Sequence, residues 1–227
     1  MSNSSKSRLA LSALVKLVAG LALICALLFG PAGSFDYIGA WRLLGLLFVP
    51  MLLMGTLFLF TSPDLLRRRL SSKEKRKTQS SVVRFSGLIF LVGFIVAGLD
   101  WRWGWSTVGA TATIVSSTVF LIGYLLYFVV MKQNEWLSRT VEVAEGQQVV
   151  STGLYGIVRH PMYMATLLMF LAMPVVLGSW WALGAFVFYI PVIVVRTLDE
   201  ERLLRTELKG YTDYCRRVRW RILPYIW

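Results

Sequence analysis

Residues 151–163 read STGLYGIVRHPMY, and the interpretation of the whole chain starts from this stretch. It holds the only histidine, His160, between Arg159 and Pro161, with Tyr155 and Tyr163 on either side. An apolar hairpin follows at once. Polar and cationic side chains are costly at the start of a membrane segment, so such a cluster is a candidate functional site. The alternative interpretation is that Arg159 and His160 only anchor a helix end at the membrane interface.

The composition is that of an integral membrane protein. Apolar residues make up 56% of the 227 residues and the mean hydropathy is +0.63, whereas soluble domains average roughly 45–50% apolar residues. Cys25 lies in an apolar run and Cys215 in a basic tail, which argues against a disulfide framework. Two scattered cysteines and a single histidine are too few to form a Cys/His zinc site, so we predict no metal. We predict no nucleic-acid partner either, because the net charge of +12 comes from residues flanking apolar segments.

The apolar segments predict an all-α integral membrane protein with about six transmembrane helices in a single domain, residues 1–227. The predicted spans are 9–29, 41–60, 82–99, 108–131, 164–177 and 180–195. Four of them lie within 9–131, and 132–227 forms the catalytic region. The last two form a tight helical hairpin, which Pro174 and Pro191 should break or tilt. An amphipathic cytoplasmic tail helix follows from Arg196.

The distribution of basic residues predicts the orientation. Lysine and arginine gather near both termini and in the loops 61–84 and 132–160, whereas the opposite loops carry little beyond Arg42 and Arg102. Arg102 belongs to a predicted short loop, 100–105, rich in tryptophan. The positive-inside rule therefore places both termini in the cytoplasm. We predict a protein of the bacterial inner membrane, in contact with membrane lipids.

Polar side chains stand at both open ends of the predicted hairpin. The first end carries Arg159, His160 and Tyr163, and the second carries Arg196, Glu200 and Glu201. Antiparallel packing of a short hairpin should bring these ends to one site. Arginine, histidine and tyrosine can donate to a carboxylate, and glutamate can accept from an ammonium or from ribose hydroxyls. A simple surface ion pair between Arg196 and Glu200, four residues apart on one helix face, is the alternative.

Familiar nucleotide, phosphate, zinc-protease and hydrolase motifs are absent from the sequence. Instead, T-G-L-Y at 152–155 and V-R-H-P-M-Y at 158–163 resemble the signature of the isoprenylcysteine carboxyl methyltransferase family, within the wider phospholipid methyltransferase group. Arg196 with Glu200-Glu201, then Tyr211 and Tyr214 up to Pro224, resembles the C-terminal pattern of that family. The resemblance covers about the last third of the chain. It implies a membrane methyltransferase that uses S-adenosylmethionine, without a Rossmann domain, and takes a lipophilic or small-molecule acceptor.

The resemblance also implies roles for individual residues. The implied cofactor-binding residues are Gln147, Gln148, Val149, Val150, Tyr155, His160, Pro161, Met162, Tyr163 and Glu200. Arg196 would face the methyl acceptor. If the acceptor is a neutral amine or hydroxyl, Glu201 or His160 would be the base, so Arg196 and Glu201 are the predicted catalytic residues. One departure is that residues 140–144 lack a glutamine that the family often has there.

Two other functions compete with this interpretation. The same R-H-x-x-Y element and the ending from Asp213 to Tyr225 are similar to NADPH-dependent sterol reductases, which makes a membrane oxidoreductase the alternative enzyme. Against it, such reductases usually have more spans. A non-catalytic scaffold or transporter is the third class. The absence of an internal repeat and the position of the polar cluster at one face argue against a transporter.

Overall fold

The computed structural model describes residues 3–70, 77–138, 140 and 143–227, and within these ranges the chain is helical and has no strand. The elements are α1 (Asn3–Ala32), α2 (Ile38–Thr61), α3 (Pro63–Leu70), α4 (Lys77–Trp103), α5 (Ala110–Gln133), the 3-10 turn η1 (Gly153–Gly156), α6 (Pro161–Leu177), α7 (Trp180–Val187), α8 (Tyr189–Glu207) and α9 (Tyr211–Arg217). Among the described residues, α1, α2, α4, α5 and the combined α7–α8 segment are long and apolar enough to cross a membrane. The shorter apolar α6 completes the bundle. The prediction of an all-α membrane protein is confirmed.

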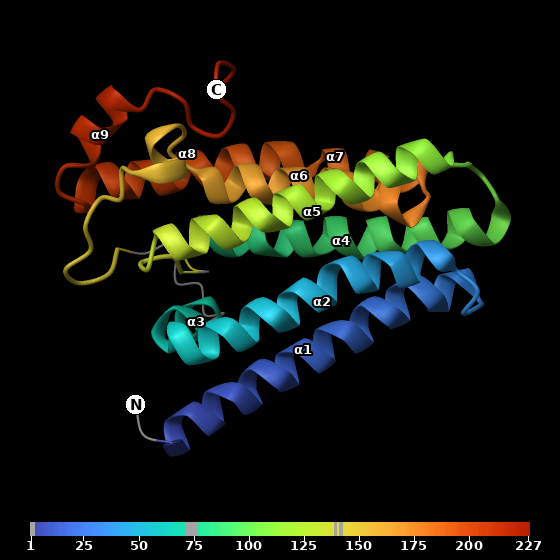
Figure 1. Cartoon of the computed structure of the whole chain (residues 1–227). Helices are drawn as coiled ribbons and strands as arrows, with labels where there is room; N and C mark the ends of the chain where they lie inside the picture. Colours follow the sequence, from blue (N-terminus) through green and yellow to red (C-terminus); the bar gives the residue numbers. More distant parts are fainter. Residues whose placement is uncertain (1–2, 71–76, 139, 141–142) are drawn as a thin grey trace.

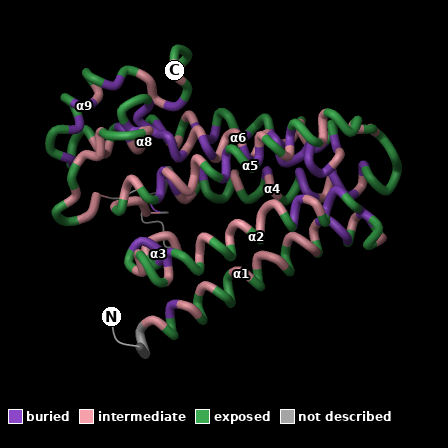
Figure 2. The backbone as a smooth tube through the Cα atoms, in the orientation of Figure 1, coloured by how far each residue is buried: buried purple, intermediate pink, exposed green. Residues whose placement is uncertain are grey.

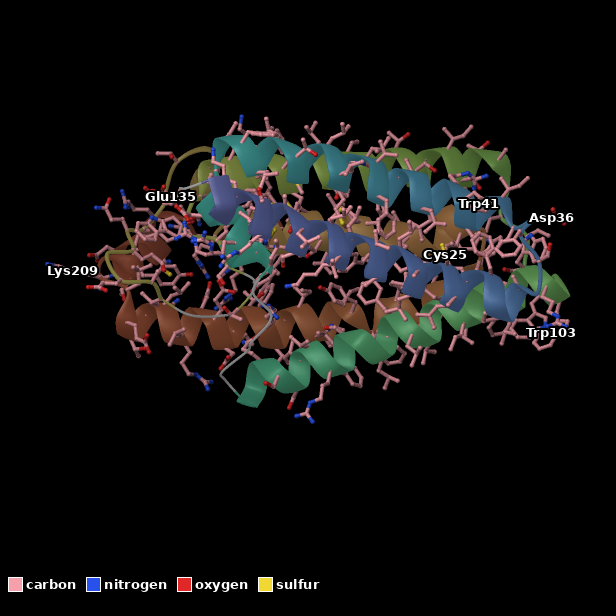
Figure 3. All side chains as sticks on the ribbon, turned by 90° about the horizontal axis from the view of Figure 1, so that it is seen from below. Cys25, Asp36, Trp41, Trp103, Glu135 and Lys209 are labelled. Atoms are coloured by element: carbon pink, nitrogen blue, oxygen red, sulfur yellow. The ribbon has the colours of Figure 1, made fainter. Side chains whose placement is uncertain are left out.

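The long helices run side by side, and both termini lie at the same end of the bundle, together with α3 and α9 (Figure 1). We call this the motif end, because residues 151–163 lie there, and the opposite end the far end. Seen from another side, Glu135 and Lys209 lie at the motif end, whereas Asp36 and Trp103 lie at the far end (Figure 3). The outer faces of α1 and α2 are largely exposed (Figure 2) and carry apolar side chains such as Leu11, Val15 and Leu53. These faces suit contact with lipid.

Small residues set the closest helix contacts. Helix α5 packs along α6 more extensively than any other described pair of helices. At Gly123 of α5, an added Cβ atom would lie 2.8 Å from Met169 Cγ and 3.0 Å from the Ala165 carbonyl oxygen of α6. At Gly39 of α2, it would lie 2.2 Å from the Leu177 carbonyl oxygen. Close backbone approach at small residues is the usual way in which membrane helices associate.

Polar groups tie the helix ends together at the far end. The Asp100 carboxylate accepts hydrogen bonds from Ser106 N at 2.7 Å, from the Ser106 hydroxyl at 2.6 Å and from the Ser179 hydroxyl. Ser179 also caps α7 by accepting from Ala182 N at 3.0 Å. Arg42 Nη1 donates to the Val176 carbonyl at 3.0 Å, in the last turn of α6, where a cation is favourable.

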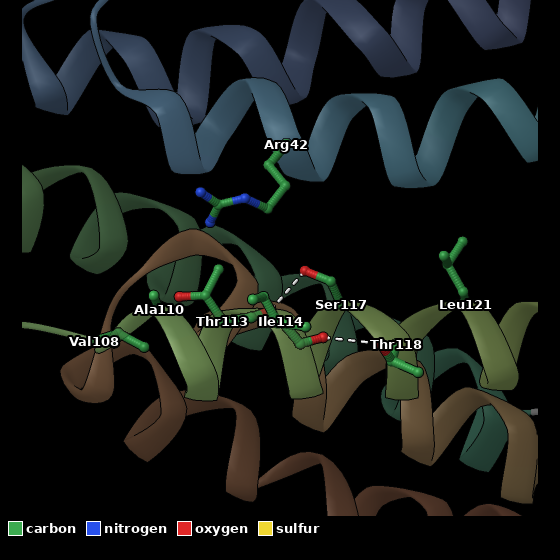
Figure 4. A pocket seen from close by; sticks show the side chains of 8 residues that line it. All are labelled: Arg42, Val108, Ala110, Thr113, Ile114, Ser117, Thr118 and Leu121. Atoms are coloured by element: carbon green, nitrogen blue, oxygen red, sulfur yellow. Dashed lines mark hydrogen bonds between the residues drawn. The ribbon is translucent and has the colours of Figure 1, made fainter.

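Arg42 borders a shallow cavity of about 500 Å³ on the lipid-facing side of α5. Its side chain reaches from α2 toward Thr113 and Ala110, and the Ser117 and Thr118 hydroxyls of α5 donate to backbone carbonyls of the preceding turn (Figure 4). This cavity is formed by other residues than those of the sequence motif, and the bond to α6 gives Arg42 a structural role.

Three local expectations need correction. The predicted loop 100–105 starts later, because Asp100 to Trp103 form the last turn of α4 and Gly104, with φ 62°, ends it. The predicted tail helix is the continuation of α8, which runs without interruption to Glu207. Of the two prolines, Pro191 accompanies a break at Phe188, since its ring conflicts with the carbonyl four residues earlier. Helix α6 runs past Pro174 to Leu177, so this proline does not break it.

Candidate functional site

A cavity of about 820 Å³ opens among the helices at the motif end. Most residues of the implied cofactor and acceptor site line it: Gln147, Gln148, Val149, Val150, Tyr155, His160, Met162, Tyr163, Arg196 and Glu200. Two predicted site residues do not line it. Pro161 is the buried first residue of α6, and Glu201 points into a separate, buried ionic cluster.

Tyr163 joins the two ends of the hairpin. Its hydroxyl donates to the Glu200 carboxylate and accepts from Arg196 Nε at 3.0 Å. The Arg196 guanidinium also lies 5.9 Å from the centre of the Tyr163 ring, within the range of a cation–π contact. The His160 and Tyr163 rings are stacked, with 5.5 Å between their centres and 17° between their planes. The structure therefore brings the first residues of α6 and the middle of α8 to one wall of the cavity.

Glu201 is the centre of the ionic cluster behind that wall. Its carboxylate accepts from Arg159 Nε at 2.6 Å and from Arg221 Nε at 3.2 Å, and it lies 3.3 Å from His160 Nε2. Arg205 Nη2 is 3.6 Å away. The residue is only 3% exposed. A buried carboxylate needs such partners to offset its desolvation, and here they also hold His160 at the edge of the cavity.

The segment after α9 holds the motif from the other side. His160 N donates to the Arg221 carbonyl at 2.7 Å, and Arg159 N donates to the Trp220 carbonyl at 2.9 Å. The Tyr214 hydroxyl donates to the Tyr155 carbonyl at 2.7 Å. These bonds bind the backbone of the motif to residues some sixty positions later, so the C-terminal region is part of the site.

Tyr211, in α9, places its hydroxyl 3.5 Å from His160 Nε2, and the residue also lines the cavity. Burial, reinforced by the nearby Glu201 carboxylate, raises the pKa of Tyr211 far above its usual range. The phenol therefore stays neutral and remains a hydrogen-bond donor or acceptor at physiological pH.

The turn before the motif depends on a glycine. Gly153 has φ 60°, and an added Cβ atom would lie 2.4 Å from Gln133 Nε2 at the end of α5. Gln133 Oε1 accepts from Leu154 N at 2.9 Å, and Asn134 Nδ2 donates to the Tyr155 hydroxyl at 3.0 Å. The last residues of α5 thus fix the position of Tyr155. Burial raises the pKa of this tyrosine above its usual range, so it too stays neutral.

Beyond the polar side chains at the motif end, the cavity continues between apolar side chains, and we call this second part the apolar limb. Four described membrane helices supply most of its walls: Leu47, Met51 and Met54 of α2, Val82, Val83 and Phe90 of α4, Met169 and Phe170 of α6, and Tyr189, Val192 and Ile193 of α8. A site of this size, mostly apolar with a few convergent polar groups, is the usual form of a small-molecule pocket.

The sequence interpretation missed several residues of this cavity. Arg69 of α3 and Tyr127 of α5 line it, as does Asn134. Arg69 belongs to a run of basic residues that reads as an ordinary loop, of which Lys73, Lys75 and Arg76 lie outside the described residues. Tyr211 could have been found, because it belongs to the tyrosine pattern of the C-terminal region.

The similarity to a known protein family lies in the region that contains the motif and the hairpin. The phospholipid methyltransferase family matches residues 105–209, from the loop before α5 to the end of α8. A Delta(14)-sterol reductase of Mus musculus is 35% identical over 91 residues, which are 39% of this chain and 22% of that protein. A Delta(14)-sterol reductase of Arabidopsis thaliana is 28% identical over 127 residues, 51% of this chain and 34% of that protein.

The chain thus spans no more than about a third of the length of these two reductases. The family match, by contrast, includes the predicted motif, the hairpin and most of the polar residues around the cavity. Residues 105–209 therefore match the phospholipid methyltransferase family, the wider group to which the motifs pointed.

Proposed function

We propose that the protein is an S-adenosylmethionine-dependent methyltransferase that acts on a lipophilic or small acceptor. One observation carries the proposal. A single cavity joins the side chains of the R-H-P-x-Y motif and Glu200 to an apolar limb between membrane helices, within the region of the family match. Such a cavity offers a polar place for a charged cofactor beside a place for an apolar acceptor.

The residues present fit S-adenosylmethionine. Glu200 offers a carboxylate to the ammonium or ribose hydroxyls of the cofactor, and the buried Tyr155 and Tyr211 are neutral donors. The stacked rings of His160 and Tyr163 form a flat aromatic wall. We assign the cofactor to this wall and to residues 147–150 beside it. The Gln147 side-chain oxygen accepts from Ala144 N at 2.9 Å, so this segment is itself held in a turn.

The bound cofactor supplies a methyl group on a sulfonium sulfur. Transfer of that methyl group to the nucleophilic atom of the acceptor would leave S-adenosylhomocysteine, with the electron pair of the broken carbon–sulfur bond on sulfur. The protein has to align the two reactants and keep water out. Arg196, held by Tyr163, would orient an anionic acceptor, and the apolar limb would exclude water.

A neutral acceptor would also have to lose a proton. Among the predicted bases, His160 lines the cavity, whereas Glu201 does not line it and is bonded to Arg159 and Arg221. We therefore propose that Glu201 is a positioning residue that orients His160, and that His160 is the residue within reach of a neutral acceptor. We further propose that the motif end faces the cytoplasm of a bacterial cell.

Calorimetry with purified protein tests the proposal. S-adenosylhomocysteine should bind, and Glu200→Gln and His160→Ala should each weaken binding about tenfold or more, because each removes a polar contact in the cavity. Glu207→Gln is the matched control, since Glu207 is exposed near the end of the same helix. If S-adenosylhomocysteine does not bind, or if both site variants bind as tightly as the control, the proposal is wrong.

The same measurement with NADPH decides the alternative. The partial similarity to Delta(14)-sterol reductases makes a membrane oxidoreductase the second candidate. Binding of NADPH without binding of S-adenosylhomocysteine would favour the oxidoreductase.

If S-adenosylhomocysteine binds, the class of methyl acceptor can be identified by labelling. Membranes are incubated with S-adenosylmethionine labelled on the methyl group and are then separated into lipid, protein and volatile fractions.

A further inference from the structure

Arg69 is a cation in the cavity that the cofactor motif does not explain. It lies in α3, a short amphipathic helix whose Leu65 and Leu66 are buried. Helix α3 sits on the opposite side of the motif end from α9 (Figure 1). The Arg69 side chain therefore approaches the cavity from the α2–α3 side, whereas Arg196 and Glu200 approach from α8.

The contacts of Arg69 hold the guanidinium in place without neutralising it. Nη1 donates to the Ser138 carbonyl at 2.9 Å, and Nη2 donates to the Tyr127 hydroxyl. The guanidinium also lies 5.5 Å from the centre of the Tyr127 ring. Among the described residues, no carboxylate forms a salt bridge with it. A fixed, half-buried cation that has no anionic partner within the described part of the chain is suited to an anionic ligand.

The neighbours of Arg69 indicate what else that ligand carries. Leu70 follows it along the wall, and the apolar limb continues with Met54 and Met51 of α2. Val83 of α4 lines the same cavity and is 39% exposed. The cavity is thus not closed at its apolar limb. A molecule with an apolar chain and an anionic group could place the chain there and the anion at Arg69.

We infer that Arg69 and Tyr127 form a subsite for the phosphate or carboxylate group of an amphiphilic acceptor, whose apolar chain lies in the limb between α2 and α4. This inference rests on the proposed function and adds to it the residues that recognise the acceptor. The acceptor would meet the α3 side of the cavity, and the cofactor would occupy the side formed by α6, α8 and residues 147–150.

Binding of defined amphiphiles tests the subsite. The probes are dodecyl phosphate, dodecanoate and the neutral dodecyl glucoside, measured by native mass spectrometry on the full chain in a neutral detergent. The two anions should bind about tenfold or more tightly than the glucoside. Arg69→Gln should remove this preference, because the charge-assisted hydrogen bonds are lost. Arg69→Lys, which retains the charge, should keep most of it.

Arg67→Gln is the matched control. Arg67 lies in the same helix, is exposed and pairs with Asp64 at 3.3 Å, so its replacement should leave the preference unchanged. If Arg67→Gln and Arg69→Gln weaken anion binding equally, or if the wild type binds all three probes alike, the subsite does not exist. Tyr127→Phe gives a second test, because it removes only a hydroxyl and should lower the preference while the helix packing stays intact.

Binding of S-adenosylhomocysteine separates the subsite from the cofactor site. It should be unchanged in Arg69→Gln. If it weakens in that variant as strongly as the anionic probes do, Arg69 holds the carboxylate of the cofactor and the inference is wrong. If S-adenosylhomocysteine fails to bind the wild type while the anionic preference persists, the proposed function fails and the anion subsite stands. Inorganic phosphate should compete only weakly, since it lacks the chain, and equal competition would overturn the assignment to an amphiphile.

Discussion

At the scale of single residues, two neighbouring glutamates have different surroundings. Glu200 contacts Tyr163 and lines the cavity, whereas Glu201 does not line it and bonds to Arg159 and Arg221. Consecutive residues of a helix point in directions about 100° apart, so one carboxylate can face the ligand while the next faces the interior. The buried cluster around Glu201 holds together residues from the segment just before α6, from α8 and from the C-terminal segment.

Glu201→Gln should therefore destabilise the protein strongly. The variant leaves Arg159 charged and buried without its carboxylate, a change that typically costs about 3–5 kcal/mol. Thermal unfolding in detergent would show this as a clear fall in Tm. Asp213→Asn is the control, because the Arg216–Asp213 pair has side chains 78% and 75% exposed and exposed pairs contribute less than about 1 kcal/mol. Equal Tm values for the two variants would contradict this role of Glu201.

At the scale of helices, the bundle depends on a few places where backbones approach closely. Gly39→Ala in α2 would place a Cβ atom 2.2 Å from the Leu177 carbonyl oxygen, so α2 would have to move away from the end of α6. Overpacking of this kind typically costs about 1–3 kcal/mol. We expect a lower Tm for Gly39→Ala in the thermal unfolding measurement.

Gly45→Ala provides the comparison within the same helix. An added Cβ atom at Gly45 meets nothing within 4 Å, and alanine favours a helix over glycine by up to about 1 kcal/mol. This variant should be as stable as the wild type or slightly more stable. If both alanine variants unfold at the same temperature, the close contact between α2 and α6 does not contribute to stability.

At the scale of the whole molecule, charge separates the two ends. Arg67, Arg68, Arg69 and the basic residues of α9 lie at the motif end, whereas Asp36 and Trp103 mark the far end (Figure 3). The positive-inside rule then predicts a cytoplasmic motif end. Single cysteines at Asp36 and Lys209, both exposed, would report the orientation.

In a background of Cys25→Ala and Cys215→Ser, a membrane-impermeant maleimide added to intact cells should label Asp36→Cys. It should label Lys209→Cys only after the membrane is opened. The reverse pattern would place the motif end outside the cytoplasm. Labelling of both variants in intact cells would show that the helices do not separate these two residues across the membrane.

Much of this protein could be predicted from the sequence alone. Hydropathy determined the membrane helices, because apolar runs long enough to cross a bilayer have few other stable environments. The motif around His160 and the hairpin after it indicated one polar site, and the polar residues named at the two ends of the hairpin, all except Glu201, do line one cavity. The loop predicted at 100–105 started too early because hydrogen bonds from Ser106 and Ser179 make Asp100 acceptable at a helix end.

Only the tertiary structure decided which side chains share the cavity. Arg69 and Tyr127 lie far from the motif in the sequence and carry no local pattern, so their place depends on how α3 and α5 pack. The sequence also left Glu201 as a candidate base beside Glu200, since hydropathy and motif spacing cannot show that the Glu201 carboxylate points away from the cavity. Secondary structure follows from local periodicity and solvent preference, but the direction and the partners of a polar side chain are determined by contacts between distant segments.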